Sequence, residues 1–239
     1  MNVLKALPDD MPRRPPGVLD VLAEARLAWT WLQAKRQGDA VLAGLPRGRG
    51  DAVMLLPGYG ADETNMRLLR DRLRVLGHDA RHWGEGRNHG MINKLIPKLG
   101  ARLRAWVAEL GRPVHLVGWS LGGYIARELA REHPDLVASV VTLGSPAVGG
   151  PKYTITAPIY RRKGFDLDAI EADMAKRDHL PICCPLTVVF SRRDGVVSWP
   201  ACLDRKTPQA RHVEINCAHF AQPLDAGVLR VVAEALATA

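Results

Sequence analysis

The sequence lacks the features that mark membrane and secreted proteins. It contains no uninterrupted run of about eighteen apolar residues, which a membrane-spanning helix would need. Its beginning places Asp9, Asp10 and several prolines where a secretory signal peptide would need an apolar core. We therefore expect a soluble, cytoplasmic protein.

Motifs for metals, nicotinamide cofactors and nucleic acids are also missing. Neither an H-E-x-x-H ligand pair nor a G-x-G-x-x-G turn after a strand occurs, so we expect no cofactor and no metal. The 33 Lys and Arg residues are spread over most segments, without an aromatic-interleaved basic stripe. The net charge of +8 therefore favours solubility, and we expect no nucleic-acid partner.

Cysteine is scarce, and its spacing does not suit zinc. The four cysteines are Cys183, Cys184, Cys202 and Cys217. We interpret them as packing thiols, and a disulfide between Cys202 and Cys217 stays open at this point.

The length of 239 residues, with 47% hydrophobic residues, fits one compact domain with a sizeable core. Before that domain, apolar residues recur at helical spacing over 18–35, and glycine and proline interrupt the pattern up to Gly50. We predict an N-terminal helical extension over residues 1–50. Its two tryptophans also fit a homodimer contact or a contact with a membrane surface.

From Asp51 onward, short β-rich runs alternate with longer amphipathic segments. This alternation is typical of a parallel sheet covered by helices. Strands are expected at 52–56, 78–83, 114–119, 137–143, 186–191 and 212–215, and helices at 65–76, 95–110, 121–132 and 228–237. The fold class is therefore α/β, with a reduced, mostly parallel sheet of about six strands flanked by helices in a domain over 51–239.

An insertion over residues 145–184 interrupts the alternation. It carries glycines, prolines and aromatic residues, with one helix expected over 167–177. A segment of this length between two strands is often functional, so we interpret it as a short lid.

A candidate nucleophile lies in the pentapeptide from Gly118 to Gly122. A serine with glycine two positions away on either side fits a very tight strand-to-helix turn, which projects the hydroxyl above the sheet. Ser120 follows the strand expected at 114–119 and precedes the helix expected at 121–132, as such a turn requires.

Five short segments carry a wider resemblance, from Asp51 to the C-terminal end: LLPGYG, GWSLGG, TLGSP, SRRDGVV and CAHF. Together they resemble the α/β-hydrolase superfamily, and more narrowly its small bacterial serine lipases and esterases. The resemblance implies an α/β-hydrolase fold and a triad in the chain order nucleophile, acid, histidine.

The resemblance assigns the acid and the base of this triad. His219 follows the last expected strand, where the superfamily carries its catalytic imidazole. Asp194 follows the strand at 186–191 and precedes Gly-Val-Val, similar to the family's acid turn. Three weaker substitutes for the acid do not directly follow an expected strand: Asp178, Asp204 and Asp225.

Two backbone N–H groups are expected to stabilise the oxyanion. One belongs to Leu121, directly after the nucleophile. The family pattern assigns the other to Tyr59, with Gly58 allowing a close approach of the backbone. Many relatives have a histidine before this glycine, whereas this chain has Pro57, so the support of the loop is not assigned.

The triad predicts a hydrolase that cleaves carboxylic esters of short to medium acyl chains through an acyl-enzyme. Its partner would be a small-molecule or lipid ester. A thioesterase, lactonase or acyltransferase with the same triad remains open, and so does a non-catalytic binding protein of the same fold. Candidate aromatic residues for an apolar substrate pocket are Trp119, Tyr153, Tyr160, Phe165, Trp199 and Phe220.

Overall fold

The computed structural model describes residues 13–17, 21, 24 and 38–238. The helix expected over 18–35 lies outside the described residues, apart from Val21 and Glu24. The described residues form a six-stranded sheet in the order β2-β1-β3-β4-β5-β6, in which every neighbouring pair is parallel. The prediction of a reduced parallel sheet is confirmed.

The strand bounds follow the apolar runs of the sequence. The strands are β1 (Ala52–Leu56), β2 (Asp79–His82), β3 (Val114–Trp119), β4 (Val137–Leu143), β5 (Leu186–Ser191) and β6 (Arg211–Ile215). Every residue of β1, β3 and β5 is buried, because a central parallel strand is covered on both faces. The edge strand β2 is shorter than expected, since the N–H of His78 instead bonds the Leu73 carbonyl at the preceding helix end.

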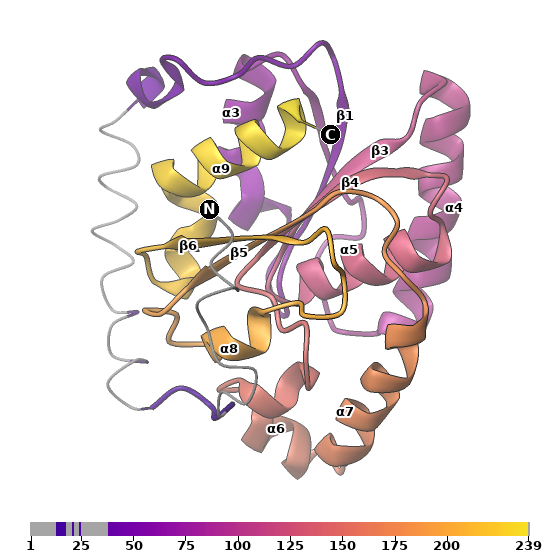
Figure 1. The fold of residues 1–239 in the computed structure, drawn as a ribbon, viewed down its shortest axis with the longest axis vertical. Coiled ribbons are helices and arrows are strands. Elements are labelled where there is room, and N and C mark those ends of the chain that lie inside the picture. Colours follow the sequence, from indigo (N-terminus) through magenta and orange to yellow (C-terminus); the bar gives the residue numbers. More distant parts are fainter. Residues whose placement is uncertain (1–12, 18–20, 22–23, 25–37, 239) are drawn as a thin grey trace.

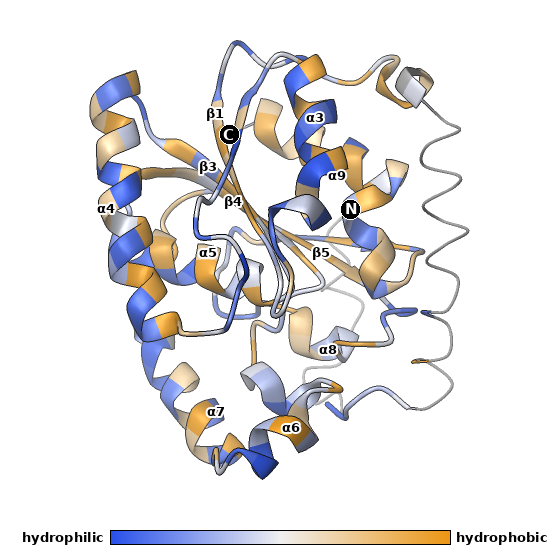
Figure 2. Cartoon of the chain, turned by 180° about the vertical axis from the view of Figure 1, so that it is seen from behind, coloured by the Kyte–Doolittle hydropathy of each residue, from blue (hydrophilic) through white to orange (hydrophobic). Residues whose placement is uncertain are grey.

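Helices cover both faces of the sheet (Figure 1). Helices α3 (Arg67–Val75) and α9 (Ala226–Ala237) pack on one face, in a cluster that includes Leu73 and Val232. Helices α4 (Ile92–Leu110) and α5 (Leu121–Glu132) pack on the other. Figure 2 shows hydrophobic colour along the strands and hydrophilic colour on the outer side of the helices. This division is what the amphipathic sequence pattern predicts.

Helix α4 begins three residues before the expected start and contains Pro97 in its second turn. Helix α3 is preceded by a 3₁₀ turn, η4 (Glu63–Met66), so the segment expected as one helix is divided in two. Helix α9 begins at Ala226, where the Asp225 carboxylate accepts the N–H of Val228. These changes adjust helix ends and leave the order of elements as expected.

The insertion over 145–184 forms short helices beyond the carboxyl end of the sheet, at the bottom of Figure 1. They are η5 (Gly150–Tyr153), α6 (Ala157–Arg162), α7 (Leu167–Lys176) and η6 (Arg177–His179). Only α7 was expected. After β5 comes another short helix, α8 (Trp199–Cys202), and the remaining 3₁₀ turns are η3 (Gly38–Leu42) and η7 (His219–Leu224). The lid role of the insertion stays a prediction.

All four cysteines are free, so Cys202 and Cys217 form no disulfide. Three of them are buried, and burial raises the pKa of Cys184 to about 11. Within residues 13–17 and 38–238, no helix is long and apolar enough to span a bilayer. The cytoplasmic location stays a prediction.

Candidate active site

The turn at Ser120 is strained. Its φ is +54° and its ψ is −123°, and it is the only non-glycine residue of the described part of the chain with a positive φ. Such a conformation costs about 1–3 kcal/mol and persists only where the surrounding structure imposes it. Such a backbone conformation at a residue other than glycine marks Ser120 as a candidate functional position.

Close backbone packing imposes this turn. A Cβ atom at Gly118 would lie 2.4 Å from the carbonyl oxygen of Gly122, and one at Gly122 would lie 2.1 Å from the carbonyl oxygen of Leu56. Both distances are shorter than any real contact, so only glycine fits at either position. The Ser120 N–H donates to the Leu143 carbonyl at 2.8 Å, which ties the turn to β4.

The loop after β1 lies directly against the Ser120 turn. A Cβ atom at Gly58 would be 3.1 Å from the Cβ atom of Ser120, so this glycine allows the close approach. No hydrogen bond in the described structure has the N–H of Tyr59 as its donor. Leu121 is the first residue of α5, where an N–H has no acceptor within its helix. Neither proposed oxyanion donor therefore has a backbone carbonyl as its partner in the described structure; Leu121 follows Ser120 directly, and Tyr59 follows Gly58.

Asn88 supports the loop after β1, a role that the sequence analysis did not detect. This fully buried residue donates from Nδ2 to the Pro57 carbonyl at 2.8 Å. Its backbone carbonyl accepts the N–H of Gly60, and its own N–H donates to the Ala61 carbonyl, each at 2.8 Å. No local pattern distinguishes Asn88, because its partners lie about 30 residues earlier in the chain.

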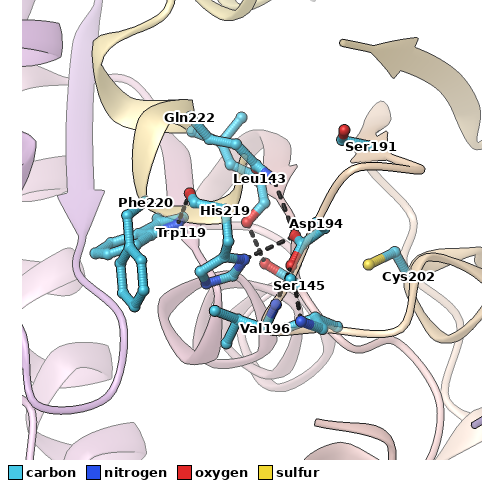
Figure 3. Close-up of polar contacts among 12 residues, drawn as sticks. Trp119, Leu143, Ser145, Ser191, Asp194, Val196, Cys202, His219, Phe220 and Gln222 are labelled. Atoms are coloured by element: carbon cyan, nitrogen blue, oxygen red, sulfur yellow. Dashed lines mark hydrogen bonds and ion pairs between the residues drawn. The ribbon is translucent and has the colours of Figure 1, made fainter. Parts of the chain in front are cut away.

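Asp194 and His219 meet across two loops, after β5 and after β6. Both are buried, and Nδ1 of His219 lies 2.7 Å from Oδ2 of Asp194 (Figure 3). The other carboxylate oxygen, Oδ1, accepts the N–H groups of Val196 at 2.9 Å and of Val197 at 2.7 Å. This arrangement fixes the ring and leaves Nε2 as the imidazole nitrogen that faces away from the carboxylate.

Gln222 completes the set of donors around Asp194 and was not predicted. Its Nε2 donates to Oδ2 of Asp194 at 3.0 Å, and its side chain is fully buried. Figure 3 shows it on the opposite side of the carboxylate from Val196. Four donors thus converge on one carboxylate and fix its position between the two loops.

The Ser120 turn and the histidine loop are joined through Trp119. Its indole Nε1 donates to the His219 carbonyl at 3.2 Å, and its ring centroid lies 5.3 Å from that of the imidazole. No hydrogen bond joins the Ser120 hydroxyl to His219 in the described structure. Catalytic hydrogen bonds are often long in ligand-free structures and shorten when substrate binds.

The weaker candidates for the acid have other partners. Asp204 forms a buried ion pair with Arg127 at 2.6 Å, and Asp225 caps α9. Although burial opposes ionisation of Asp204, Arg127 and donors that include the Thr207 hydroxyl hold its pKa at about 2. Nothing is described of the side chain of Asp178.

The aromatic residues proposed for a substrate pocket fall into separate groups. The rings of Trp119 and Phe220 both contact the His219 ring, and their own centroids lie 6.0 Å apart. Tyr160 on α6 contacts Tyr59 at 6.2 Å and Phe165 at 5.5 Å, so the insertion meets the loop after β1. Burial, together with Tyr59, raises the pKa of Tyr160.

The other two aromatic residues have different partners. Tyr153 donates its hydroxyl proton to Glu171 on α7 at 2.7 Å. Trp199 stacks on Phe190 at 5.7 Å and lies beneath the guanidinium of Arg192. Their assignment to a pocket therefore has less support than that of Tyr160 and Phe165. Across the described residues, no group of three or more His, Cys, Asp or Glu side chains could hold a metal ion.

Comparison with known proteins gives a family model, described as "Alpha/beta hydrolase family", that matches residues 53–235. A pimeloyl-[acyl-carrier protein] methyl ester esterase from Aeromonas hydrophila is 32% identical over 102 residues. The protein of the same name from Methylococcus capsulatus is 38% identical over 105 residues. Each match covers 41% of this chain and only 39% of the relative.

A solved structure of the metagenome-derived lipolytic enzymes LipS and LipT has a similar fold. It matches with a TM-score of 0.59 and 15% sequence identity, covering 81% of this chain and 95% of that chain. An identity this low indicates a shared fold and carries no activity with it.

Proposed function

The chain belongs to the alpha/beta hydrolase family, and from that membership we propose that it is a serine hydrolase that cleaves carboxylic esters. The observation that carries the proposal is the strained Ser120 turn, the only non-glycine positive φ in the described part of the chain. Two further features support it: the bond between His219 and Asp194, and the position of the loop after β1 against Ser120.

The proposed reaction begins with attack of the Ser120 hydroxyl oxygen on the ester carbonyl carbon. The hydroxyl proton passes to Nε2 of His219, and Asp194 stabilises the resulting imidazolium through Nδ1. The negative charge on the carbonyl oxygen is stabilised by the N–H groups of Tyr59 and Leu121. Removal of one such donor costs about 10²–10³-fold in kcat in other hydrolases.

The tetrahedral intermediate then loses its alcohol, which leaves with the proton from His219. The acyl group remains bonded to Ser120 as an ester. Water attacks this ester, gives one proton to His219, and releases the carboxylic acid. The proton returns to the Ser120 oxygen, so the residues end in their original state.

Two observations support the proposed substrate class: the names of the relatives, and an aromatic group that includes Tyr59 on the loop after β1. The two relatives described above are named as methyl ester esterases, so we propose a small alcohol group on the ester. Tyr59, Tyr160 and Phe165 form an aromatic group in which the rings of Tyr59 and Phe165 are exposed. An apolar acyl chain of short to medium length fits such a surface.

A panel of p-nitrophenyl and methyl esters of graded acyl length tests the proposal, with wild type, Ser120→Ala and Ser145→Ala. Ser145 is the matched control, since it is a buried serine after β4 whose hydroxyl donates to the Leu143 carbonyl. We expect Ser120→Ala to lose at least about 10³-fold in kcat, and Ser145→Ala to stay near wild type. Equal turnover by wild type and Ser120→Ala would reject the proposal.

A fluorophosphonate probe separates an enzyme from a binding protein of the same fold. Folded wild type and Ser145→Ala should be labelled at Ser120, and Ser120→Ala should not be labelled. Competition between water and an added alcohol or thiol for the acyl-enzyme then distinguishes hydrolysis from transfer to another acceptor. A lactone offered as a substrate tests the lactonase alternative. Strong preference for an added thiol or alcohol over water would overturn the assignment as a hydrolase.

A further inference from the structure

One carboxylate of the N-terminal region lies at the centre of the acid and histidine loops. Glu24 precedes the segment that matches the family, which begins at residue 53. Its Oε1 accepts the N–H of Gly195 at 2.9 Å and the N–H of His219 at 2.8 Å, and its Oε2 accepts the N–H of Phe220 at 3.1 Å. Glu24 is only 9% exposed.

All three partners of Glu24 are donors, which suits a carboxylate, a group that in its ionised form only accepts hydrogen bonds. Bonds from an N–H to an ionised acceptor are about twice as strong as those between neutral groups. A buried carboxylate is costly unless it is fully hydrogen-bonded, and here the loops supply the bonds. The contact therefore stabilises one arrangement of these loops.

The bonded positions directly adjoin the triad. Gly195 follows Asp194, and its N–H shares one Glu24 oxygen with the N–H of His219 itself. One atom thus fixes the separation of two main-chain segments that lie about 25 residues apart in the chain. The distance between the Asp194 carboxylate and the His219 ring depends on that separation.

We propose that Glu24 is a positioning residue of the active site: its carboxylate holds the acid loop and the histidine loop where Asp194 can bind His219. This inference rests on the proposed function for its activity readout, and it has a second readout that does not. Neither the family match nor the triad motif includes Glu24, so the N-terminal region completes a site built by the sheet.

Glu24→Gln tests the inference with almost no change in shape. The amide keeps one acceptor oxygen and places an N–H group where the second oxygen was, facing a backbone N–H. We expect kcat for p-nitrophenyl butyrate to fall about 10–100-fold, while KM changes less than about twofold, because the triad is misplaced and the substrate surface is not. Near-UV circular dichroism verifies that the variant is folded.

The matched control is Glu214→Gln on β6. It makes the same chemical change, but the carboxylate of Glu214 is partly exposed and pairs with Nε of Arg192 at 3.0 Å. Its kcat and KM should equal those of wild type. An equal fall in kcat in both variants would overturn the inference, because loss of charge would then explain it.

The independent readout is the proton NMR signal of the His219 Nδ1–H, which Asp194 binds. In Glu24→Gln this signal should shift or broaden, and in Glu214→Gln it should match wild type. If Ser120→Ala is fully active, the proposed function fails, yet this signal still decides the role of Glu24. An unchanged signal in folded Glu24→Gln overturns the inference, whatever its kcat.

A second variant covers the case in which Glu24→Gln does not fold. Glu24→Asp keeps the charge but is one methylene shorter, so it cannot hold all three N–H groups at once. We expect it to fold with kcat reduced at least about threefold and with a shifted His219 signal. Wild-type kcat together with a wild-type signal would overturn the inference.

Discussion

The two sides of Ser120 are built from opposite kinds of groups. On one side, Gly58 and Tyr59 form a loop that the neutral side chain of Asn88 holds. On the other side, His219 meets Asp194, and four N–H donors surround that carboxylate. On the first side the N–H of Tyr59 has no acceptor in the described structure, and on the second a carboxylate oxygen lies 2.7 Å from Nδ1 of His219.

The difference matches the charge that each side would meet during the proposed reaction. Negative charge would develop beside Tyr59, where N–H groups without backbone acceptors stabilise it. Positive charge would develop on the His219 ring, where the buried Asp194 carboxylate stabilises it. On each side, the supporting groups do not use up the group that the proposed reaction needs. A neutral amide, Asn88, holds the loop that carries Tyr59, and N–H donors hold the Asp194 carboxylate that binds His219.

The largest effect should come from Asp194→Asn, which removes the charge from the histidine side. The amide would no longer stabilise the imidazolium and would favour the wrong tautomer of His219, so kcat should fall about 10³–10⁴-fold. The rate of ester hydrolysis at saturating substrate measures this fall in kcat. The control is Asp225→Asn, because that carboxylate only caps α9; loss of activity in the control alone would contradict our assignment of the acid.

Asn88→Ala tests the other side, where no charge is lost. The Pro57 carbonyl would lose its buried donor, and the loop that carries Tyr59 would shift. We expect kcat to fall about 10²-fold and the free energy of unfolding to fall by about 1–3 kcal/mol. Asn93→Ala, on the exposed surface of α4, should change neither kcat nor the free energy of unfolding. A fully active Asn88→Ala would show that the function of the loop after β1 does not depend on Asn88.

Acid should weaken the support of the segment between β5 and β6, which carries Asp194, through Asp204, because Asp204 pairs there with Arg127 on α5. The pKa of Asp204 is about 2, below its ordinary value of 3.8. Its contribution to the free energy of unfolding, about 2 kcal/mol, is therefore present above pH 4 and is lost as the pH falls toward 2. Urea unfolding should show that the difference in the free energy of unfolding between wild type and Asp204→Asn becomes smaller from pH 5 to pH 3.

The control for this pH dependence is Asp173→Asn. Asp173 is exposed and pairs with Lys176 on the same helix. The free energy of unfolding of Asp173→Asn should therefore differ little from that of wild type at every pH. A constant difference for Asp204→Asn would show that the ion pair with Arg127 does not depend on ionisation of this carboxyl.

The smallest effect should come from Gln222→Leu, which removes one of the four donors on Asp194. Hydrogen bonds to a charged group contribute about 1.5–3 kcal/mol, and the three remaining donors offset part of the loss. We therefore expect kcat to fall about tenfold. Gln209→Leu is the matched control, because the Gln209 side chain donates to the Ile182 carbonyl, away from the triad. Equal kcat values for the two variants would show that Gln222 does not support Asp194.

The order of the fold could be predicted because it depends on local patterns. Strands β1, β3, β4 and β5 and helix α5 have the bounds that the apolar periodicity indicates. The short helices α6 and α8 were missed, since four to six residues carry too little periodicity and both contain a proline near their start. The helix expected over 18–35 lies outside the described residues, apart from Val21 and Glu24.

The sequence by itself determined that Ser120 lies in a tight turn between a strand and a helix. This was possible because glycine spacing and apolar runs act over a few residues. The resemblance to a family added Asp194 and His219 as predictions, and the structure places Oδ2 of Asp194 2.7 Å from Nδ1 of His219. Only the tertiary structure decided that Asn88, Gln222 and Glu24 hold the loops around them, because a single side chain that bonds a distant backbone leaves no periodic signal in the sequence.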